Sequence, residues 1–357
     1  MGSYNALVEQ WYSMGRTPET LLLILDTFAT LPNDWEISLE KWQALSKEKD
    51  WGYHTKSKYE STALQLYNPA SGKGQNRSKS DGVTMSNVGS FWIVEYLKAA
   101  GFYEAALTRQ LKGSGDQKTL VLAPHKMRYS THQKVVATFR DSMRYAETST
   151  RFDLLAVIRY TQALLGYLLK DDSEFAQFFD DPQDLVTGFH TAFYKDMGNA
   201  VTTMNLSFIA LPGWVQVQST DDITQYNMLL DELTSLVAQF DEGNSDAFTL
   251  LQHLRDFVSG NDLSAFFRFT DAYPAYLMGQ SRRGQSAPQL SIDFIERVVM
   301  STKPMFAEII NDEGFQRVAS AIRHATVIAQ NRASNKKFPN YPYKVRYGVQ
   351  RELIQKA

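Results

Sequence analysis

Apolar residues in this 357-residue chain recur, from about residue 130 onward, mostly with the 3.6-residue period of an α-helix. A run of amphipathic helices has to bury its apolar stripes against one another, so this pattern constrains the second part of the chain to a helical bundle. A short break around Pro212 and Gly213 predicts a hairpin between residues 205–210 and 214–218. We expect helices near 131–145, 150–170, 183–197, 222–240, 246–258, 262–270, 290–300 and 304–331.

The first part of the chain mixes helices and strands. A Thr-Pro start followed by a run of apolar residues predicts a buried helix from Pro18. Residues 91–100 predict a helix that ends at Gly101, and residues 119–124 predict a strand that ends at a proline. A shorter strand is expected at residues 64–67, immediately before a basic loop.

These elements predict an α+β fold in two domains. A mixed α/β domain over residues 1–130 is followed by a predominantly α-helical domain over residues 131–357 that ends in a basic helical bundle. The hydrophobic content of 43% supports more than one core and excludes the disordered and fibrous classes. The pattern stops at Ala357 without a helix stop signal, so we expect the parent chain to continue past it.

The net charge of −2 hides a strong asymmetry along the chain. Lys and Arg outnumber Asp and Glu by three over residues 1–150, fall short by twelve over residues 151–280, and exceed them by seven over residues 281–357. Clustered positive charge attracts polyanions even when the average charge is close to zero. The two outer regions are therefore candidates for contact with nucleic acid, and the acidic middle is expected to lie away from phosphates.

The absence of cysteine excludes a disulfide scaffold, a thiolate metal site and a cysteine nucleophile. The N-terminus lacks a basic stretch followed by an apolar core, and no apolar run reaches the length of a membrane span. We therefore expect a soluble, cytoplasmic protein with no membrane partner.

Searches for catalytic motifs find none. The six histidines show neither the H-E-x-x-H spacing nor a His-Asp dipeptide, and Walker A and nucleophile-elbow sequences are absent. The acidic pairs at 171–172, 180–181 and 221–222 can in principle hold Mg²⁺, but all three fall at expected helix starts, where carboxylates complement the helix dipole. The sequence thus predicts a protein that is not an enzyme and has no cofactor or metal.

A glycine-rich basic loop follows the short strand, over residues 68–81. Its glycines let the backbone approach a polyanion, its cations supply charge, and its amides suit base edges. The other interpretation is an ordinary solvated loop. The candidate nucleic-acid-binding residues of this loop are Lys73, Gln75, Asn76, Arg77 and Lys79.

Two further basic clusters extend the candidate surface. One lies around residues 126–144 and contains Lys126, Arg128, Lys134, Arg140 and Arg144, of which the first two are the candidate binding residues. In the other, aromatic residues alternate with cations, a combination suited to single-stranded nucleic acid, although these tyrosines can equally belong to a core. Its candidate residues are Arg282, Arg283, Arg323, Arg332, Lys336, Lys337 and Arg346.

Several segments together resemble the large subunit of type I CRISPR Cascade complexes. They are residues 64–77 (LQLYNPASGKGQNR), 91–102, 118–124, 314–330 and 343–348 (YKVRYG). The similarity spans most of the chain and lies in its overall pattern rather than in one short motif. The chain is short for that family, in agreement with the expected continuation past its last residue.

This resemblance implies a specific role in a ribonucleoprotein complex of antiviral defence. Such subunits have an N-terminal mixed α/β domain that contacts the guide-RNA end and reads the protospacer-adjacent motif, and a C-terminal helical bundle. They are not nucleases, and a separate helicase-nuclease or a transposition machinery is recruited. The loop at 68–79 would be the motif reader, and the basic face over 282–351 would follow the displaced strand or the heteroduplex.

The expected partners are accordingly guide RNA, double-stranded target DNA, and the backbone and guide-end-capping subunits of the complex. Base pairing carries most of the specificity in RNA-guided systems, which fits a chain without catalytic residues. Two alternatives from other classes stay open. One is a metal-dependent enzyme that processes nucleotides or nucleic acid with acidic residues of 171–184 or 221–222, and the other is a helical adaptor whose acidic middle docks on a basic partner.

Overall fold

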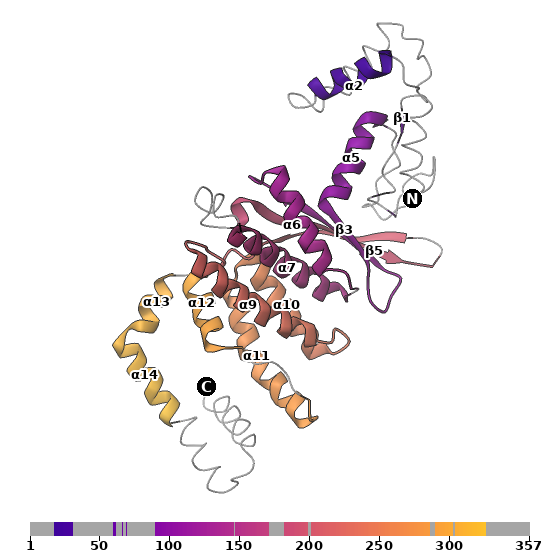
Figure 1. Ribbon diagram of the computed structural model, residues 1–357. Coiled ribbons are helices and arrows are strands. Elements are labelled where there is room, and N and C mark those ends of the chain that lie inside the picture. Colours follow the sequence, from indigo (N-terminus) through magenta and orange to yellow (C-terminus); the bar gives the residue numbers. More distant parts are fainter. Residues whose placement is uncertain are drawn as a thin grey trace. The chain divides into compact units, whose positions relative to one another are not determined.

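The computed structural model describes residues 18–30, 60–61, 66, 69, 90–145, 147–170, 182–198, 201–285, 290–302 and 304–325. The chain divides into two compact units (Figure 1). We call the first the sheet unit, which comprises Met1–Ser149 and Gly188–Ile209, and the second the helical unit, which comprises Thr150–Thr187 and Ala210–Ala357. The division expected at residue 130 differs from this arrangement. The sheet unit extends to Ser149 and also includes the distant segment Gly188–Ile209.

A four-stranded antiparallel sheet is the centre of the sheet unit, with strand order β3-β4-β5-β6. Its strands are β3 (Ala106–Gln110), β4 (Gln117–Pro124), β5 (Val186–Asp196) and β6 (Val201–Ala210). In the β3–β4 pair, Ala106 lies opposite Val121. The turn between them uses Gly113 at a φ of 83°, a conformation that favours glycine.

Two helices accompany this sheet, α5 (Trp92–Ala105) and α6 (Tyr129–Ser142). The buried residues of α6 recur at helical spacing, and Phe139 among them lies 5.5 Å from Phe189 of β5, centroid to centroid. Burial of this apolar stripe holds α6 against the sheet. A small second sheet pairs β1 (Glu60–Ser61) with β2 (Ser90–Phe91) in antiparallel register.

Two sequence predictions for the secondary structure of this unit are wrong. The helix expected over 183–197 is instead a 3₁₀ turn, Pro182–Asp184, followed by β5. Residues 186–194 are rich in β-branched and aromatic side chains, which suit a pleated surface, and the neighbouring strands supply the hydrogen-bond partners. Helix α5 continues through Gly101 to Ala105, because a single glycine weakens a helix interior without ending it.

The helix expected from Pro18 is confirmed as α2 (Pro18–Thr30), but the prediction that it is buried is wrong. Leu21, Leu22, Leu25 and Phe28 are all about half exposed or more. Composition alone cannot tell a buried apolar helix from one whose apolar side chains stay at the surface.

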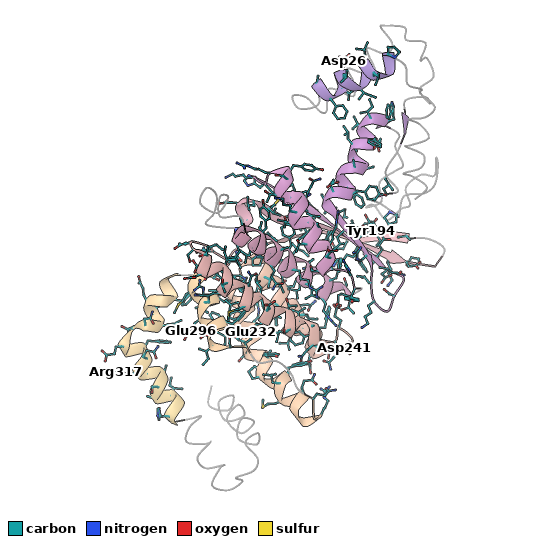
Figure 2. The ribbon with its side chains drawn as sticks, viewed as in Figure 1. Asp26, Tyr194, Glu232, Asp241, Glu296 and Arg317 are labelled. Carbon is teal, nitrogen blue, oxygen red and sulfur yellow. The ribbon has the colours of Figure 1, made fainter. Side chains whose placement is uncertain are left out.

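Seven helices described in the helical unit are α7 (Ser149–Lys170), α9 (Thr220–Gln239), α10 (Ser245–Gly260), α11 (Leu263–Arg282), α12 (Ile292–Thr302), α13 (Pro304–Asn311) and α14 (Glu313–Arg323). Most match the sequence predictions closely. The helix expected over 304–331 breaks at Asp312, whose side chain caps α14 by accepting a hydrogen bond from the backbone N–H of Phe315. Glu232 of α9 joins the start of α12 by accepting hydrogen bonds from Ser291 (Figure 2).

Among the described helices, one is long and apolar enough to cross a membrane by length and composition alone. It is the Ser149–Leu169 stretch of α7, and 72% of its most apolar window is buried inside the protein. The buried core helix of a globular unit satisfies the same criteria, and the burial here accounts for the composition.

Trp214 lies at the centre of an aromatic cluster in the helical unit. Its side chain is fully buried, and its ring stacks on Phe257 of α10 at a centroid distance of 5.9 Å. The rings of Tyr226 in α9 and Phe294 in α12 lie 6.1 and 6.0 Å away. The strand expected at 214–218 is therefore wrong, because this segment is an irregular connection that places Trp214 among three helices.

The end of α10 fixes the position of this connection. Asn261 adopts the left-handed conformation that ends α10, and its side-chain oxygen accepts a hydrogen bond of 2.9 Å from the backbone N–H of Gly213. A Cβ atom added at Gly213 would lie 2.0 Å from the Asn261 amide nitrogen. Only glycine fits this approach without a shift of Asn261.

We expect Trp214→Ala to lower the free energy of unfolding by about 3–5 kcal/mol, because it leaves a large cavity among three helices. Urea titration followed by circular dichroism measures the change. Met228→Ala is the control, since Met228 is 66% exposed on α9 and its truncation should cost less than about 0.5 kcal/mol. Equal effects of the two substitutions would contradict the assignment of Trp214 to the core.

Candidate nucleic-acid interface

The predicted residues Lys126 and Arg128 lie on the connection between β4 and α6, which we call the β4–α6 loop (residues 124–129). Both side chains are exposed. Lys126 makes no hydrogen bond or ion pair within the described part of the chain. The strand ends at Pro124 and the helix begins at Tyr129, so the sheet and α6 fix both ends of this loop.

Helix α6 begins without the usual capping groups. Arg128 occupies the N-cap position with extended backbone angles, and its side chain makes no capping hydrogen bond. The first turn contains no acidic residue. Backbone N–H groups in a first turn have no partner within the helix, and the helix dipole makes this end favourable for an anion. Two cations and the α6 N-terminus therefore lie together in one short segment.

An exposed aromatic ring adjoins these charges. Tyr129 is 61% exposed, and its ring stacks on that of His132 at 6.3 Å with an interplanar angle of 18°. Gln133 donates a hydrogen bond of 3.0 Å to the Tyr129 hydroxyl, which further fixes the ring. A ring held in place beside cations can stack on a base while the cations contact phosphates. The sequence reasoning missed Tyr129, because Ser130 looks like an ordinary N-cap for the helix expected over 131–145.

Other cations of this region have structural roles. Arg140 donates to the backbone carbonyl of Tyr103 at the end of α5 and, at 3.0 Å, to that of Ala106 at the start of β3. Arg109 donates in turn to the carbonyl of Met143 at the end of α6, at 3.2 Å. Burial, and after it the charge of Arg140, lowers the pKa of Arg109. The two arginines thus hold α5, α6 and β3 together.

Arg144 forms an exposed ion pair with Asp141 at 2.9 Å. Lys134, on the outer side of α6, stays exposed. Of the five cations that the sequence groups here, the structure therefore keeps Lys126, Arg128 and Lys134 at the solvent surface of α6 and its preceding loop, while Arg140 serves the fold and Arg144 is paired on the surface.

The next predicted pair lies at the end of α11. Arg282 is the last helical residue, and its side chain lies outside the described part. Arg283 is exposed in a turn that Gly284 closes at a φ of 71°, with the backbone N–H of Gln285 donating to Gln280. This geometry is the common glycine-terminated helix end.

A hollow of about 540 Å³ opens beside this turn. Asp241, labelled in Figure 2, places a carboxylate in the same wall as Arg283. One cation and one carboxylate give no net positive charge, so the hollow does not concentrate potential for phosphate. Its walls are Gln239, Asp241, Asn244, Tyr276, Gln280, Arg283 and Gln285.

The remaining predicted site residues cannot be placed. Arg323 ends α14, and its side chain lies outside the described part. Also outside it are Lys73, Gln75, Asn76, Arg77, Lys79, Arg332, Lys336, Lys337 and Arg346. The structure brings Lys126 and Arg128 together on one loop, and it brings no other two of the predicted binding side chains into a described site.

Described cations near the chain end are largely paired. Arg297 forms an ion pair with Asp222, and Arg317, labelled in Figure 2, pairs with Glu313 at 2.5 Å. The segments 290–302 and 304–325 contain three arginines and five acidic residues. Apart from Arg282 and Arg283, the positive charge of the last region therefore belongs mainly to residues beyond 325.

The acidic pair at 221–222 takes a structural role at Asp222. Ser219 caps α9 by accepting a hydrogen bond from the Asp222 backbone, and its hydroxyl donates back to the Asp222 carboxylate at 2.8 Å. Burial alone would raise the pKa of Asp222, but hydrogen bonds from Ser219, Arg297 and the Gln218 backbone, with the charge of Arg297, hold it below the usual value. No group of three metal-ligating side chains occurs within the described ranges. The pairs at 171–172 and 180–181 fall outside them.

With this geometry in view, comparison with known proteins finds no matching family model, no matching curated protein and no matching solved structure. A function for this chain therefore has to be argued from its own residues.

We expect Asp222→Asn to lower the free energy of unfolding by about 1 kcal/mol at neutral pH, since it removes a carboxylate from a helix cap and an ion pair. The folded pKa of Asp222 is depressed, so its contribution is present above about pH 4 and is lost as the pH falls through the folded value. Urea titrations between neutral and acidic pH measure the difference between the two proteins.

Asp221→Asn is the matched control, because Asp221 adjoins Asp222 in the first turn of α9 and faces no arginine partner in the described part of the chain. Its substitution should change stability less. A difference for Asp222→Asn that stays constant down to strongly acidic pH would contradict the role of the carboxylate.

Proposed function

We propose that this chain is a non-catalytic, nucleic-acid-binding large subunit of a CRISPR RNA-guided complex of the type I Cascade kind. It recognises the protospacer-adjacent motif on target DNA and stabilises the R-loop. The β4–α6 loop is the observation on which the proposal chiefly rests, because it joins Lys126, Arg128 and the ring of Tyr129 at the start of a helix without an acidic first turn.

This combination suits nucleic acid better than a small anion. The lysine, the arginine and the helix N-terminus can each contact a phosphate oxygen, and contacts of this kind set the position and orientation of a nucleic acid. The exposed Tyr129 ring adds a surface on which an unpaired base can stack. A free phosphate would use the charge and leave the ring without a function.

The distribution of charge between the two units also favours contact between nucleic acid and the sheet unit rather than the helical unit. The described residues of the sheet unit contain ten Lys and Arg against nine Asp and Glu. The described residues of the helical unit contain ten against seventeen. The helical unit therefore repels phosphates, whereas the sheet unit is almost neutral and carries its excess of positive charge in residues 90–145 and 147–149.

In this proposal the mixed α/β part contacts the guide end of the RNA and reads the motif, with the loop at 68–79 as the reader. The helical part, with the basic segment beyond residue 325, follows the displaced strand. The partners are guide RNA, double-stranded target DNA, the other Cascade subunits, and a recruited helicase-nuclease or transposition factor in the cytoplasm. The subunit needs no cofactor.

One experiment separates this proposal from an enzyme. The chain is purified from its native host, and the molecules that come with it are identified. A guide RNA and a repeated backbone subunit are the expected companions. Turnover of nucleotides or nucleic acid by the isolated chain in Mg²⁺ would contradict the proposal.

The acidic helical unit favours a second candidate function, that of a helical adaptor that docks on a basic partner. The two candidate functions predict different molecules that co-purify with the chain. An adaptor would co-purify with a basic protein and without RNA.

Lys126→Ala and Arg128→Ala should each weaken binding to nucleic acid about equally for all sequences, because phosphate contacts carry no sequence information. Each should also reduce the slope of log affinity against log salt concentration by about 1. Fluorescence anisotropy with a labelled oligonucleotide at several salt concentrations measures both quantities. Arg144→Ala is the control, because Arg144 follows the far end of α6 and pairs there with Asp141. An unchanged slope for all three variants would contradict the interface.

Substitution of Lys73, Gln75, Asn76 and Arg77 by Ala tests the motif reader separately. We expect the four-fold variant to assemble normally and to lose discrimination among flanking motif sequences, since amides and glycine-rich backbone read base edges. Competition binding with a set of motif sequences measures the preference. An unchanged preference would show that the reader lies elsewhere.

A further inference from the structure

Strand β6 lies at the edge of the four-stranded sheet. The strand order ends with β6, and no other strand in the described part of the chain pairs with its outer side. Its ten residues, VTTMNLSFIA, include neither a charged residue nor a proline. Edge strands of single-chain proteins usually carry such residues, which prevent pairing with other chains. This edge lacks that protection over its whole length.

One face of β6 also presents an exposed apolar row. Met204, Leu206 and Phe208 are 54%, 59% and 44% exposed. They alternate along the strand and so share a face. The residues of opposite parity near the ends of the strand, Thr203 and Ile209, are buried. That face is thus covered only near the ends of the strand, since Asn205 at its middle is exposed, and the other face presents three large apolar side chains to solvent.

The neighbouring strand holds this row in place. The rings of His190 and Phe208 lie 5.1 Å apart, and the hydroxyls of Thr191 and Ser207 are joined by a hydrogen bond of 2.7 Å. These contacts tie β6 to β5 across the hairpin. The exposed row is thus a fixed surface and not a frayed chain end.

We propose that β6 pairs with β6 of a second copy of this chain, antiparallel and with Leu206 on the two-fold axis. In this register Met204 faces Phe208 of the second copy, and Leu206 faces its own counterpart. Asn205 faces Ser207 of the second copy on the opposite side of the strands. The two sheets join into one, and the two apolar rows lie side by side on the same face of it, in contact across the new strand pair.

The sequence of the strand favours a second copy over a different protein. With Leu206 on the axis, the apolar Met204 lies opposite the apolar Phe208, and the polar Asn205 lies opposite the polar Ser207. A two-fold interface needs such self-complementarity, and the absence of charge removes like-charge repulsion across the axis. The pairing uses the exposed edge on both chains, so assembly stops at the dimer. This inference does not depend on the proposed nucleic-acid function.

A single-cysteine experiment tests the register, since the natural sequence contains no cysteine. Directly opposite residues in an antiparallel pair have Cα atoms about 4.5–5.5 Å apart, which suits a disulfide. Full-length Leu206→Cys should form a disulfide-linked dimer on mild oxidation, much faster than the control Met228→Cys, whose site on α9 is equally exposed. Met204→Cys and Phe208→Cys should cross-link to each other when mixed, and each far less with itself.

Sedimentation equilibrium of the unmodified full chain gives an independent readout. We expect a concentration-dependent dimer, monomers for Leu206→Lys and for Leu206→Glu alone, and a restored dimer when these two variants are mixed. Circular dichroism of each variant confirms that it is folded. A wild-type chain that stays monomeric at all concentrations, or Leu206→Cys that cross-links no faster than Met228→Cys, would overturn the proposal. A wild-type dimer without restoration in the mixture would likewise overturn it, because the dimer would then use another surface.

Discussion

The pairing of β4 with β5 is the constraint on which the sheet unit depends. These strands are neighbours in the sheet, but α6 and α7 lie between them in the sequence. The chain has to form the first half of the sheet, enter the helical unit at residue 150, return for residues 188–209, and enter the helical unit again. Closing so long a loop costs conformational entropy, which local interactions cannot offset. The chain therefore passes from the sheet unit into the helical unit twice, after Ser149 and after Ile209, to complete one sheet.

Both surfaces with proposed functions follow from this pairing. The β4–α6 loop leaves one end of β4, and the sheet that β5 completes holds that end and the buried face of α6 through Phe139 and Phe189. Strand β6 is added by the same segment, and it becomes the edge of the sheet because the chain returns to the helical unit after Ile209. An exposed basic loop and an exposed apolar edge thus belong to one continuous sheet.

Local signals in the sequence predicted most helices well. Apolar spacing placed α9, α10 and α12 to within about two residues, because this signal is contained within each helix. The strand β5 could not be recognised, because its apolar residues fit either period and only the distant strand β4 decides between them. The position of Trp214 likewise depends on three helices that meet only in the folded chain.

The candidate interface was predicted in part. A count of basic residues grouped Lys126 and Arg128 with Arg140, but the count cannot show that Arg140 binds backbone carbonyls at the end of α5 and the start of β3. Nor can it show that the arginines at 297 and 317 are paired with carboxylates. The sequence asymmetry of charge was a sound guide to the acidic helical unit, because most of those carboxylates lie on the exposed sides and first turns of its helices.

Photo-cross-linking of the complex purified from the native host, followed by mass spectrometry of the cross-linked peptides, tests the central claim most directly. The account predicts that peptides of the β4–α6 loop, with Tyr129 as the attachment site, carry guide RNA or target DNA. Cross-links confined to the acidic helices α9–α12, or a purified protein without any nucleic acid, would contradict it.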